Sequence, residues 1–176
     1  DGNEMTAELL DGEALAGRMR MELGDRVARM KAEGISVGLG TVLVGVDAPS
    51  ERYVAMKHAD CAEVGITSHH VHLPADATQR DVEDAIDAFN DNPEVHSYLV
   101  QLPLPSGLDE AAALLRVNPD KDVDGLHPVN LGKLVMGVNA PLACTPAGIV
   151  ELLAAHRVPV EGKHVVVIGR GLTIGR

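Results

Sequence analysis

The sequence predicts an α/β fold in which helices cover a parallel sheet. Two patterns alternate along the chain: segments with apolar residues at helical spacing, and short apolar runs of the kind that form buried strands. The chain has 176 residues, of which 45% are apolar and 23% charged, so it is long enough to bury a sizeable core. The last apolar run leads into a glycine-rich turn, which is how a βαβ unit begins.

The first expected helix covers residues 15–31, where apolar side chains recur at helical spacing until Gly34 ends the pattern. Residues 39–46 (LGTVLVGV) are almost uninterruptedly apolar and are expected to form a buried strand. Residues 66–73 (ITSHHVHL) are expected to form a second, short strand.

One helix is expected between these two strands and another after them. Ser50 is a suitable N-cap for a helix that runs to about residue 64, and Gly65 is a suitable residue to end it. Thr78 is the expected cap of a helix over residues 78–90, and the acidic residues in its first turns suit the helix dipole.

Three further elements are expected before the final glycine-rich turn. A strand is expected at residues 96–102 (HSYLVQL), which Pro103 stops, and a short helix at residues 109–117. Residues 118–137 are rich in turn-forming residues, so no regular element is expected there. Thr145, which proline follows, is expected to start a helix that ends at about residue 156.

Charge and composition exclude several classes of function. The net charge is -11, from 15 Lys and Arg against 26 Asp and Glu, and such a chain repels phosphate backbones and anionic lipid. Aromatic residues make up 2%, too few for stacking single-stranded nucleic acid. The sequence has neither a transmembrane run nor a signal-peptide pattern, and two cysteines, Cys61 and Cys144, suit a reducing compartment. We therefore expect a cytoplasmic protein that binds neither nucleic acid nor membranes.

Tyr53 and Lys57 are the first pair of candidate catalytic residues. They lie four positions apart in the helix expected after Ser50, so they share one helix face. A lysine next to a phenol, partly removed from water, can exchange protons near neutral pH. The alternative is an exposed lysine and a tyrosine that fixes the helix to the sheet.

Gln101 lies near the end of the strand expected at residues 96–102. Ligands of open α/β sheets collect outside the carboxyl ends of the strands. A neutral amide at that place can both donate to and accept from a heterocycle. The alternative is a surface glutamine that closes the loop.

An aspartate-rich segment, DKDVDG, follows later in the chain. Asp120, Asp122 and Asp124 with Gly125 match the first half of a calcium-binding loop. The position that should hold a bidentate glutamate holds Leu131, so a calcium-binding module is a weak alternative. These aspartates are expected to form turns, or one of them faces the site as a hydrogen-bonding carboxylate.

Three histidines occur close together at His69, His70 and His72, and the alternate pair His70 and His72 would share one strand face. A metal site needs more ligands than this stretch supplies. We expect polar residues on a strand face here, and no metal site in the chain.

Residues 165–168 (VVVI) are expected to form a buried strand that leads into the turn GRGLTIG. Glycines allow the backbone to approach a pyrophosphate, and a helix that starts after such a turn favours the anion. The spacing of Gly169, Gly171 and Gly175 is one residue longer than the usual fingerprint. Arg170 could add positive charge toward a 2′-phosphate, which favours NADP over NAD.

Five segments in this order resemble one family, the bifunctional methylenetetrahydrofolate dehydrogenase/methenyltetrahydrofolate cyclohydrolase of the bacterial FolD type. The resemblance covers nearly the whole chain from about residue 10. The segments are SERYVAMK at residues 50–57, VQLPLP at 100–105, KDVDGLHPVN at 121–130, CTPAGIVELL at 144–153 and VVVIGRGLTIGR at 165–176.

The resemblance implies two reactions of one-carbon metabolism: oxidation of 5,10-methylenetetrahydrofolate to 5,10-methenyltetrahydrofolate with NADP, and hydrolysis of the latter to 10-formyltetrahydrofolate. It implies a folate-binding catalytic α/β domain over residues 1–145. Residues 146–176 would be a linker helix and the first strand and glycine turn of a Rossmann-like NADP-binding domain. Relatives of this family are homodimers, so a homodimer is expected for the complete protein.

The same resemblance implies the site residues. Lys57 would be the central catalytic residue of the hydrolysis, with Tyr53 beside it, Gln101 tuning the lysine and Asp124 holding the pterin ring. NADP would contact Gly169, Arg170 and Gly171. The residues that would line the substrate pocket are Tyr53, Val54, Ala55, Met56, Lys57, Val100, Gln101, Leu102 and Asp124.

The sequence departs from the family pattern in two ways. Gly171 stands where the family's common GRS turn has serine, which removes a hydroxyl contact to the cofactor. The sequence also stops at Arg176, inside the glycine turn, so we expect the 176 residues to be a fragment that binds NADP weakly. The alternative function is therefore a folate-binding fragment without catalytic activity.

A short-chain dehydrogenase is a rival interpretation, because its catalytic pair is also Tyr-x-x-x-Lys. In that class the glycine-rich turn precedes the pair. Here it follows Lys57 by more than a hundred residues, and this order argues against the rival.

Overall fold

A three-stranded parallel sheet lies at the centre of the molecule, whose computed structural model describes residues 7–174. The strand order is β2–β1–β3, and the strands cover Gly38–Val44 (β1), Thr67–Leu73 (β2) and Ser97–Val100 (β3). All three carboxyl ends therefore lie at one edge of the sheet, where ligands of parallel sheets usually bind. The α/β fold class predicted from the sequence is confirmed.

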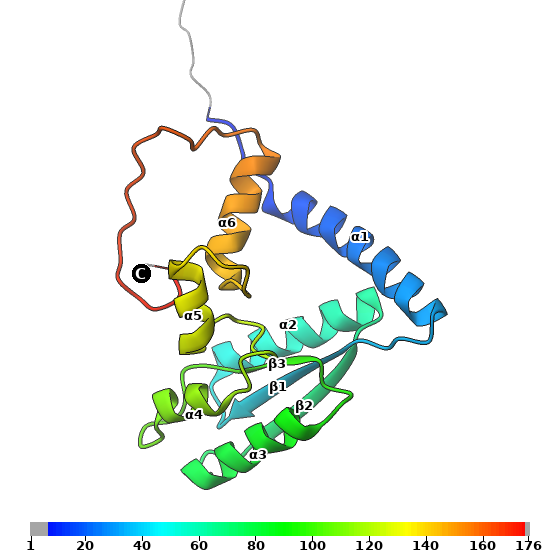
Figure 1. The fold of residues 1–176 in the computed structure, drawn as a ribbon, viewed down its shortest axis with the longest axis vertical. Coiled ribbons are helices and arrows are strands. Elements are labelled where there is room, and N and C mark those ends of the chain that lie inside the picture. Colours follow the sequence, from blue (N-terminus) through cyan, green and yellow to red (C-terminus); the bar gives the residue numbers. More distant parts are fainter. Residues whose placement is uncertain (1–6, 175–176) are drawn as a thin grey trace, which may run out of the picture.

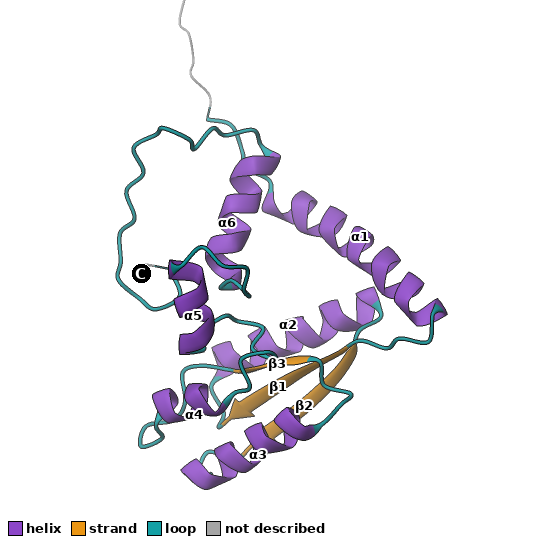
Figure 2. Ribbon diagram, viewed as in Figure 1, coloured by secondary structure: helices purple, strands orange, loops and turns teal. Residues whose placement is uncertain are grey.

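Helices cover both faces of the sheet (Figure 1). The helix α2, over Ala48–Val64, lies on one face. On the other face lie α3, over Gln79–Asp91, and α4, over Glu110–Arg116. Three more helices, at some distance from the sheet in Figure 2, are α1 over Gly12–Ala32, α5 over Pro128–Val135 and α6 over Cys144–Ala155.

The main hydrophobic core lies between the sheet and α3. Side chains alternate along a strand, so Val42 and Val44 of β1 face α3 whereas Thr41 and Leu43 face the α2 side. Tyr98 of β3 is fully buried in this core. The α3 side chains in the core are Val82, Ala85, Ile86 and Phe89.

Most helix ends follow the expected chemistry. Thr78 caps α3 in a reciprocal capping box with Asp81, and Gly65 ends α2 with a φ of 83°, as predicted. Ser50 is not the cap of α2, because the helix starts earlier and Asp47 caps it: Asp47 Oδ2 accepts from the Ser50 amide and hydroxyl at 3.0 and 2.6 Å. Thr145 is not a cap either, since α6 starts at Cys144 without a side-chain cap.

Two segments differ from the sequence prediction in secondary structure. The expected turn region 118–137 contains α5, which starts with a proline at a position that helices tolerate. Residues 165–168 were expected to form a buried strand, and this prediction is wrong. Their side chains are 59–96% exposed and no strand pairs with them among residues 7–174. A strand that is apolar on both faces needs neighbouring strands and helices to bury it.

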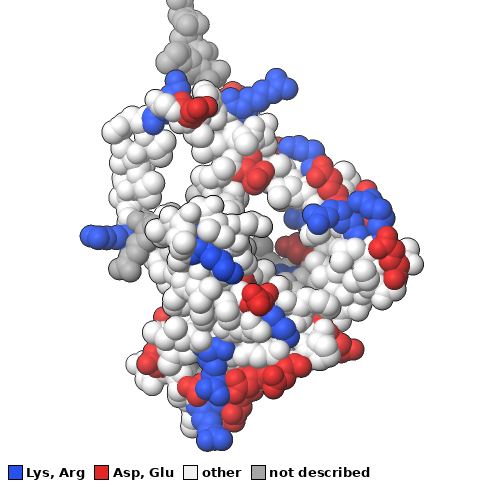
Figure 3. Space-filling view, viewed as in Figure 1, with Lys and Arg blue, Asp and Glu red and all other residues white. Residues whose placement is uncertain are grey.

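Charged side chains gather over α3 at the lower edge of Figure 3, whereas the surface over α5 and the C-terminal loop carries few. Arg116 of α4 joins α4 to α3 through a 2.6 Å ion pair with Asp87 and a 3.6 Å pair with Glu83. None of the helices within residues 7–174 is long and apolar enough to cross a membrane.

Three histidines lie together on the α2 side of the sheet. His70 of β2 is paired with Thr41 of β1, and the Thr41 hydroxyl lies 2.8 Å from His70 Nδ1 and 3.3 Å from His58 Nε2 of α2. The His70 ring also lies 5.9 Å from that of His72, so this alternate pair shares a face as expected. Burial, followed by the charges of His58 and His72, lowers the pKa of His70 from its ordinary value of 6.5.

Acidification is therefore expected to destabilise the folded chain in part through His70. The unfolded chain takes up this proton at a higher pH than the folded chain does, so the free energy of unfolding falls as the pH falls through about 6.5. His70→Gln removes this contribution. Urea unfolding at about pH 7.5 and about pH 5.5 should show a smaller pH dependence for His70→Gln than for the wild type. The exposed-loop control His164→Gln should retain the wild-type dependence, and an equal dependence in all three proteins would contradict the prediction.

Candidate active site

Lys57 of α2 is half-buried and points to the carboxyl edge of the sheet. Its Nζ donates to Gln101 Oε1 at 3.2 Å. Tyr53 lies one helical turn earlier on the same face of α2 and is 59% exposed, so its phenol is accessible from solvent next to the lysine. The structure thus brings the Lys57 amine to the strand end where the sequence predicts a site.

Gln101 follows β3 directly, and two contacts fix its orientation. Its backbone amide donates to the Val42 carbonyl at 2.8 Å, which continues the pairing of β3 with β1. Its side-chain Nε2 donates to the Leu102 carbonyl at 2.9 Å, so Oε1 is the atom left to face Lys57. An amide oxygen in this position accepts from the lysine and sets the direction of its N–H groups.

The segment before Asp124 extends the sheet by a short parallel bridge. Tyr98 pairs with Asp122: the Tyr98 amide donates to the Lys121 carbonyl at 2.9 Å, and the Val123 amide donates to the Tyr98 carbonyl at 3.4 Å. Because the two segments run in the same direction, the chain after Asp122 advances beside the chain after Tyr98. This pairing carries Asp124 toward the end of β3, where Gln101 lies.

Asp124 and Lys57 are close enough for their charges to interact. Burial raises the pKa of the Asp124 carboxyl above its ordinary value; the Lys57 charge lowers it, and the Asp122 charge raises it further. A half-buried carboxyl with a raised pKa beside an amine is typical of groups that exchange protons. Lys57, Gln101 and Asp124 are called the amine–amide–carboxyl cluster below.

The C-terminal end of α3 holds the segment that carries Asp124. Asn90 Oδ1 accepts from the Tyr98 hydroxyl at 2.7 Å and from the Asn118 amide at 2.9 Å. Lys121 Nζ donates to the carbonyls of Phe89 and Asn92 at 2.9 and 2.8 Å. These contacts fix the turn before Asp124 without using Asp124 itself.

Cys144 is a neighbour of the cluster to which the sequence analysis gave no role. It is the exposed first residue of α6; partial removal of the thiol from water and the Asp124 charge raise the pKa of the thiol, while the Lys57 charge lowers it. The thiol of Cys144 therefore responds to the charges of both the carboxyl and the amine. The spacing of Cys144 from the other site residues gives no signal of this, because a turn and α5 separate them in the chain.

The other residues predicted to line a substrate pocket fall into two groups. Val54 and Val100 are buried, each 3% exposed, so their side chains belong to the packing that positions Lys57 and Gln101. Ala55 and Met56 are exposed on α2, and Leu102 is half-buried next to Gln101. Contact of these five residues with a ligand stays a prediction.

Gly125 is required where the DVDG turn meets the segment before α6. Its φ is +66°, and a Cβ there would lie 2.5 Å from the Pro141 carbonyl oxygen. Gly125→Ala is therefore expected to lower the free energy of unfolding by at least about 2 kcal/mol, from left-handed strain and overpacking together.

Gly137→Ala is the matched control for Gly125→Ala. Gly137 has nearly the same φ, +68°, but no atom lies within 4 Å of an added Cβ. Gly137→Ala is therefore expected to lower the free energy of unfolding by only about 1–2 kcal/mol, the cost of a left-handed backbone conformation at alanine. Denaturant unfolding measures both variants, and equal losses would contradict a close approach at Gly125.

The aspartates and histidines do not converge on a metal. Asp120 is exposed. Asp122 is buried and accepts hydrogen bonds from His127 and Asn130, and Asp124 interacts with the charge of Lys57. Within residues 7–174 no group of three or more His, Cys, Asp or Glu is arranged to hold a metal ion.

The glycine-rich turn expected to bind a cofactor lies in the exposed loop after α6. Gly169 has a φ of +134°, which favours glycine, but a Cβ on Gly169 or Gly171 would meet no atom within 4 Å. Arg170 is exposed, no helix follows the turn up to residue 174, and Gly175 lies outside the described residues. Gly169, Arg170 and Gly171 therefore do not form a phosphate cradle in this structure.

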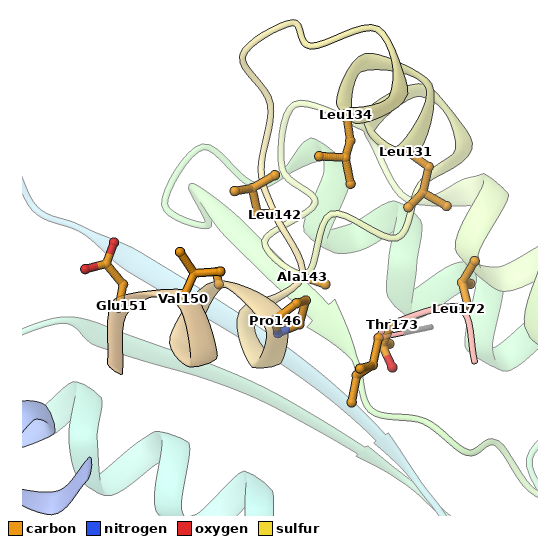
Figure 4. Close-up of a pocket in the computed structure, with 11 residues that line it drawn as sticks. Leu131, Leu134, Leu142, Ala143, Pro146, Val150, Glu151, Leu172 and Thr173 are labelled. Carbon is orange, nitrogen blue, oxygen red and sulfur yellow. The ribbon is translucent and has the colours of Figure 1, made fainter. Parts of the chain in front are cut away.

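An apolar cavity of about 290 Å³ lies between α5, α6 and residues 172–174 (Figure 4). Leu134 and Val150 are among the residues that line it, and Glu151 is the one charged residue of the lining. The cavity shares no residue with the cluster. Since it offers no converging polar groups, the amine–amide–carboxyl cluster is the better candidate for an active site.

The fold and the cluster define a class: a parallel α/β protein with an amine, an amide and a carboxyl gathered at the carboxyl edge of its sheet. Comparison with known families gives the narrower assignment. Residues 10–124 match the catalytic domain of tetrahydrofolate dehydrogenase/cyclohydrolase, and residues 143–176 match the NAD(P)-binding domain of the same enzymes. The chain belongs to the tetrahydrofolate dehydrogenase/cyclohydrolase family.

Solved structures agree with this assignment. The chain is 39% identical to the bifunctional FolD methylenetetrahydrofolate dehydrogenase/cyclohydrolase of Campylobacter jejuni, with a TM-score of 0.93 over 96% of this chain and 60% of that one. It is 38% identical to the FolD of Trypanosoma brucei, which was solved with NADP and an inhibitor (TM-score 0.92; 96% and 58%). It is 31% identical to the methylenetetrahydrofolate dehydrogenase of the silkworm Bombyx mori (0.92; 97% and 59%). The chain thus spans about three-fifths of the length of these relatives.

Proposed function

We propose that this chain carries the folate site of a methylenetetrahydrofolate dehydrogenase/methenyltetrahydrofolate cyclohydrolase. The observation that carries the proposal is the 3.2 Å hydrogen bond from Lys57 Nζ to Gln101 Oε1, beside the Asp124 carboxyl. A half-buried amine with a fixed orientation and a neighbouring carboxyl is what hydrolysis of a charged iminium carbon requires.

The hydrolysis has two proton transfers that the cluster can serve. Water adds to the iminium carbon of 5,10-methenyltetrahydrofolate, so a C–O bond forms and the water loses a proton. A C–N bond of the five-membered ring then breaks: the leaving nitrogen gains a proton, and the added hydroxyl loses its proton to solvent as the formyl C=O forms. Lys57 is proposed to relay the proton of the water and that of the leaving nitrogen, and its hydrogen bond to the Gln101 oxygen supports this role by holding the amine in one orientation.

Asp124 is proposed to bind the pterin ring. A carboxyl oxygen accepts hydrogen bonds from ring N–H groups, and burial of the group strengthens such bonds. Burial raises the pKa of Asp124 above its ordinary value, whereas the Lys57 charge favours the ionised carboxylate that accepts these hydrogen bonds. Tyr53, exposed at the mouth of the site, is proposed to contact the substrate next to Lys57.

Oxidation of the methylene compound is proposed for the complete protein with NADP as cofactor. NADP supplies the hydride acceptor for this reaction. The match of residues 143–176 to an NAD(P)-binding domain supports it. Gly169, Arg170 and Gly171 are the proposed contacts.

Hydrolysis and binding assays on the purified chain test the proposal. We expect the 176-residue chain to bind tetrahydrofolate in calorimetry and to accelerate the hydrolysis of 5,10-methenyltetrahydrofolate. Binding without acceleration would favour the alternative, a folate-binding fragment without catalysis. Absence of saturable binding would overturn both.

The compartment, the absence of nucleic-acid and membrane binding, and the oligomeric state are proposed from composition and from the family resemblance. The net charge of -11 and the free thiols of Cys61 and Cys144 support a cytoplasmic protein that binds neither nucleic acid nor membranes. A homodimer of the complete protein rests on the family resemblance. Light scattering at several protein concentrations would test the oligomeric state.

A further inference from the structure

Asp122 is a buried carboxylate that the proposed reaction does not use. It is 5% exposed, and its Oδ2 accepts two hydrogen bonds, from the His127 amide and from Asn130 Nδ2, both at 2.9 Å. Both donors lie at the beginning of α5. The side chain of Asp122 therefore joins the DVDG turn to α5.

The backbone around Asp122 is held by β3 and by α5. Asp122 forms the parallel bridge with Tyr98 of β3. Asn130, which is fully buried, also donates to the Pro119 carbonyl at 2.8 Å, so α5 holds the turn on both sides of Asp122. Asp124 lies two residues beyond this fixed point.

The geometry points to Asp122 as a positioning residue for Asp124: it holds Asp124 beside Lys57 and, two residues away in the same turn, brings a second carboxylate close to it. The carboxylate is fixed by its two N–H donors, and its position two residues before Asp124 sets the direction of the turn. The positioning of Asp124 by Asp122 does not depend on the proposed function, whereas any effect of Asp122 on hydrolysis rests on that function.

Two charged groups act on the pKa of Asp124: Lys57 of α2 favours its ionised form, and Asp122 of its own turn disfavours that form. Cys144 of α6 is a third titratable group nearby, and the Asp124 charge raises the pKa of its thiol. The His127 ring nitrogens have other partners: Nδ1 accepts from the Val129 amide at 3.1 Å and Nε2 lies 3.3 Å from the Leu115 carbonyl. The negative charge of Asp122 therefore opposes the effect of Lys57 on the pKa of Asp124.

Asp122→Asn removes the negative charge at position 122 and keeps a side-chain oxygen that can accept the same hydrogen bonds. Asparagine keeps an oxygen that can accept from both His127 and Asn130, but it carries no charge. Asp120→Asn is the matched control, since it makes the same change of charge at an exposed position of the same turn.

The test is a titration of the Asp124 carboxyl carbon by NMR, with the resonance assigned from Asp124→Asn. In Asp122→Asn the midpoint should move to lower pH than in the wild type, and in Asp120→Asn it should not move. An unchanged midpoint in a folded Asp122→Asn protein would overturn the inference. If that variant does not fold, the wild type still decides: the Asp122 carboxyl resonance should show an inflection at the midpoint of Asp124, and its absence would overturn the inference.

The pH profile of hydrolysis separates this inference from the proposed function. If the chain hydrolyses methenyltetrahydrofolate, the acidic limb of the profile should move in Asp122→Asn in the same direction as the NMR midpoint. A moved NMR midpoint in a protein without hydrolase activity would support the inference while counting against the proposed function.

Discussion

Replacement of Lys57 by methionine should lower the rate of methenyltetrahydrofolate hydrolysis by about 10²–10⁴-fold, the usual contribution of one acid–base group. Methionine keeps an unbranched apolar stem but has no N–H to donate to Gln101 Oε1 and no proton to relay. The rate should be measured in the active protein by single-turnover kinetics, so that product release does not hide the effect.

Lys31→Met is the control for this prediction. Lys31 is an exposed residue in the last turn of α1, so the same change of residue type there should leave hydrolysis unchanged. Tetrahydrofolate affinity should be measured in parallel to show that Lys57→Met still folds and binds. Near-normal hydrolysis by Lys57→Met would remove this lysine from the catalytic role.

Replacement of Tyr98 by alanine should cause the largest loss of stability, about 3–5 kcal/mol, as for other large buried aromatic residues. Tyr98 is fully buried, its ring packs edge-on against Phe89 at 5.4 Å and its hydroxyl donates to Asn90. The change leaves a cavity between β3 and α3. Denaturant unfolding gives the loss in free energy from the shift in midpoint.

Tyr98→Phe keeps the aromatic ring and removes the hydroxyl. The ring contacts remain, and Asn90 Oδ1 still accepts from the Asn118 amide, so the loss should be only about 1 kcal/mol. A loss below about 1 kcal/mol in Tyr98→Ala would contradict the account of the core, since no buried aromatic residue should be removed at so small a cost.

Local sequence patterns predicted most of the fold because this sheet is built by strong local signals. Val42 and Val44 lie in an apolar run long enough for one strand, and Gly65 and Thr78 supply the end and start of helices by their own chemistry. The cap of α2 was misassigned because Asp47 and Ser50 are both good N-caps and only the three-dimensional path decides between them.

The strand expected at residues 165–168 failed for a different reason. A run of four apolar residues indicates burial on both faces, but burial comes from neighbours and not from the run itself. In the described chain the sheet ends at β2 and β3, and residues 165–168 lie away from both edges. Helix α5 was missed because glycine, asparagine and proline around it favour turns, and tertiary contacts of Asn130 outweigh this local preference.

The candidate site was predictable in part. Helical spacing places Tyr53 and Lys57 on one face, and the end of a strand marks Gln101 as close to any ligand. Choosing Asp124 from three neighbouring aspartates needed the family resemblance, because the bridge between Tyr98 and Asp122 that directs it is a long-range contact. Cys144 had no local signal at all.

A chemical-shift map of the chain titrated with tetrahydrofolate tests the central claim most directly. If Lys57, Gln101 and Asp124 form the folate site, the largest saturable shifts should appear at the Lys57 side chain, the Gln101 side-chain amide and the Asp124 backbone amide. Shifts centred on Leu134 and Val150 in the apolar cavity, or no saturable shifts, would contradict it.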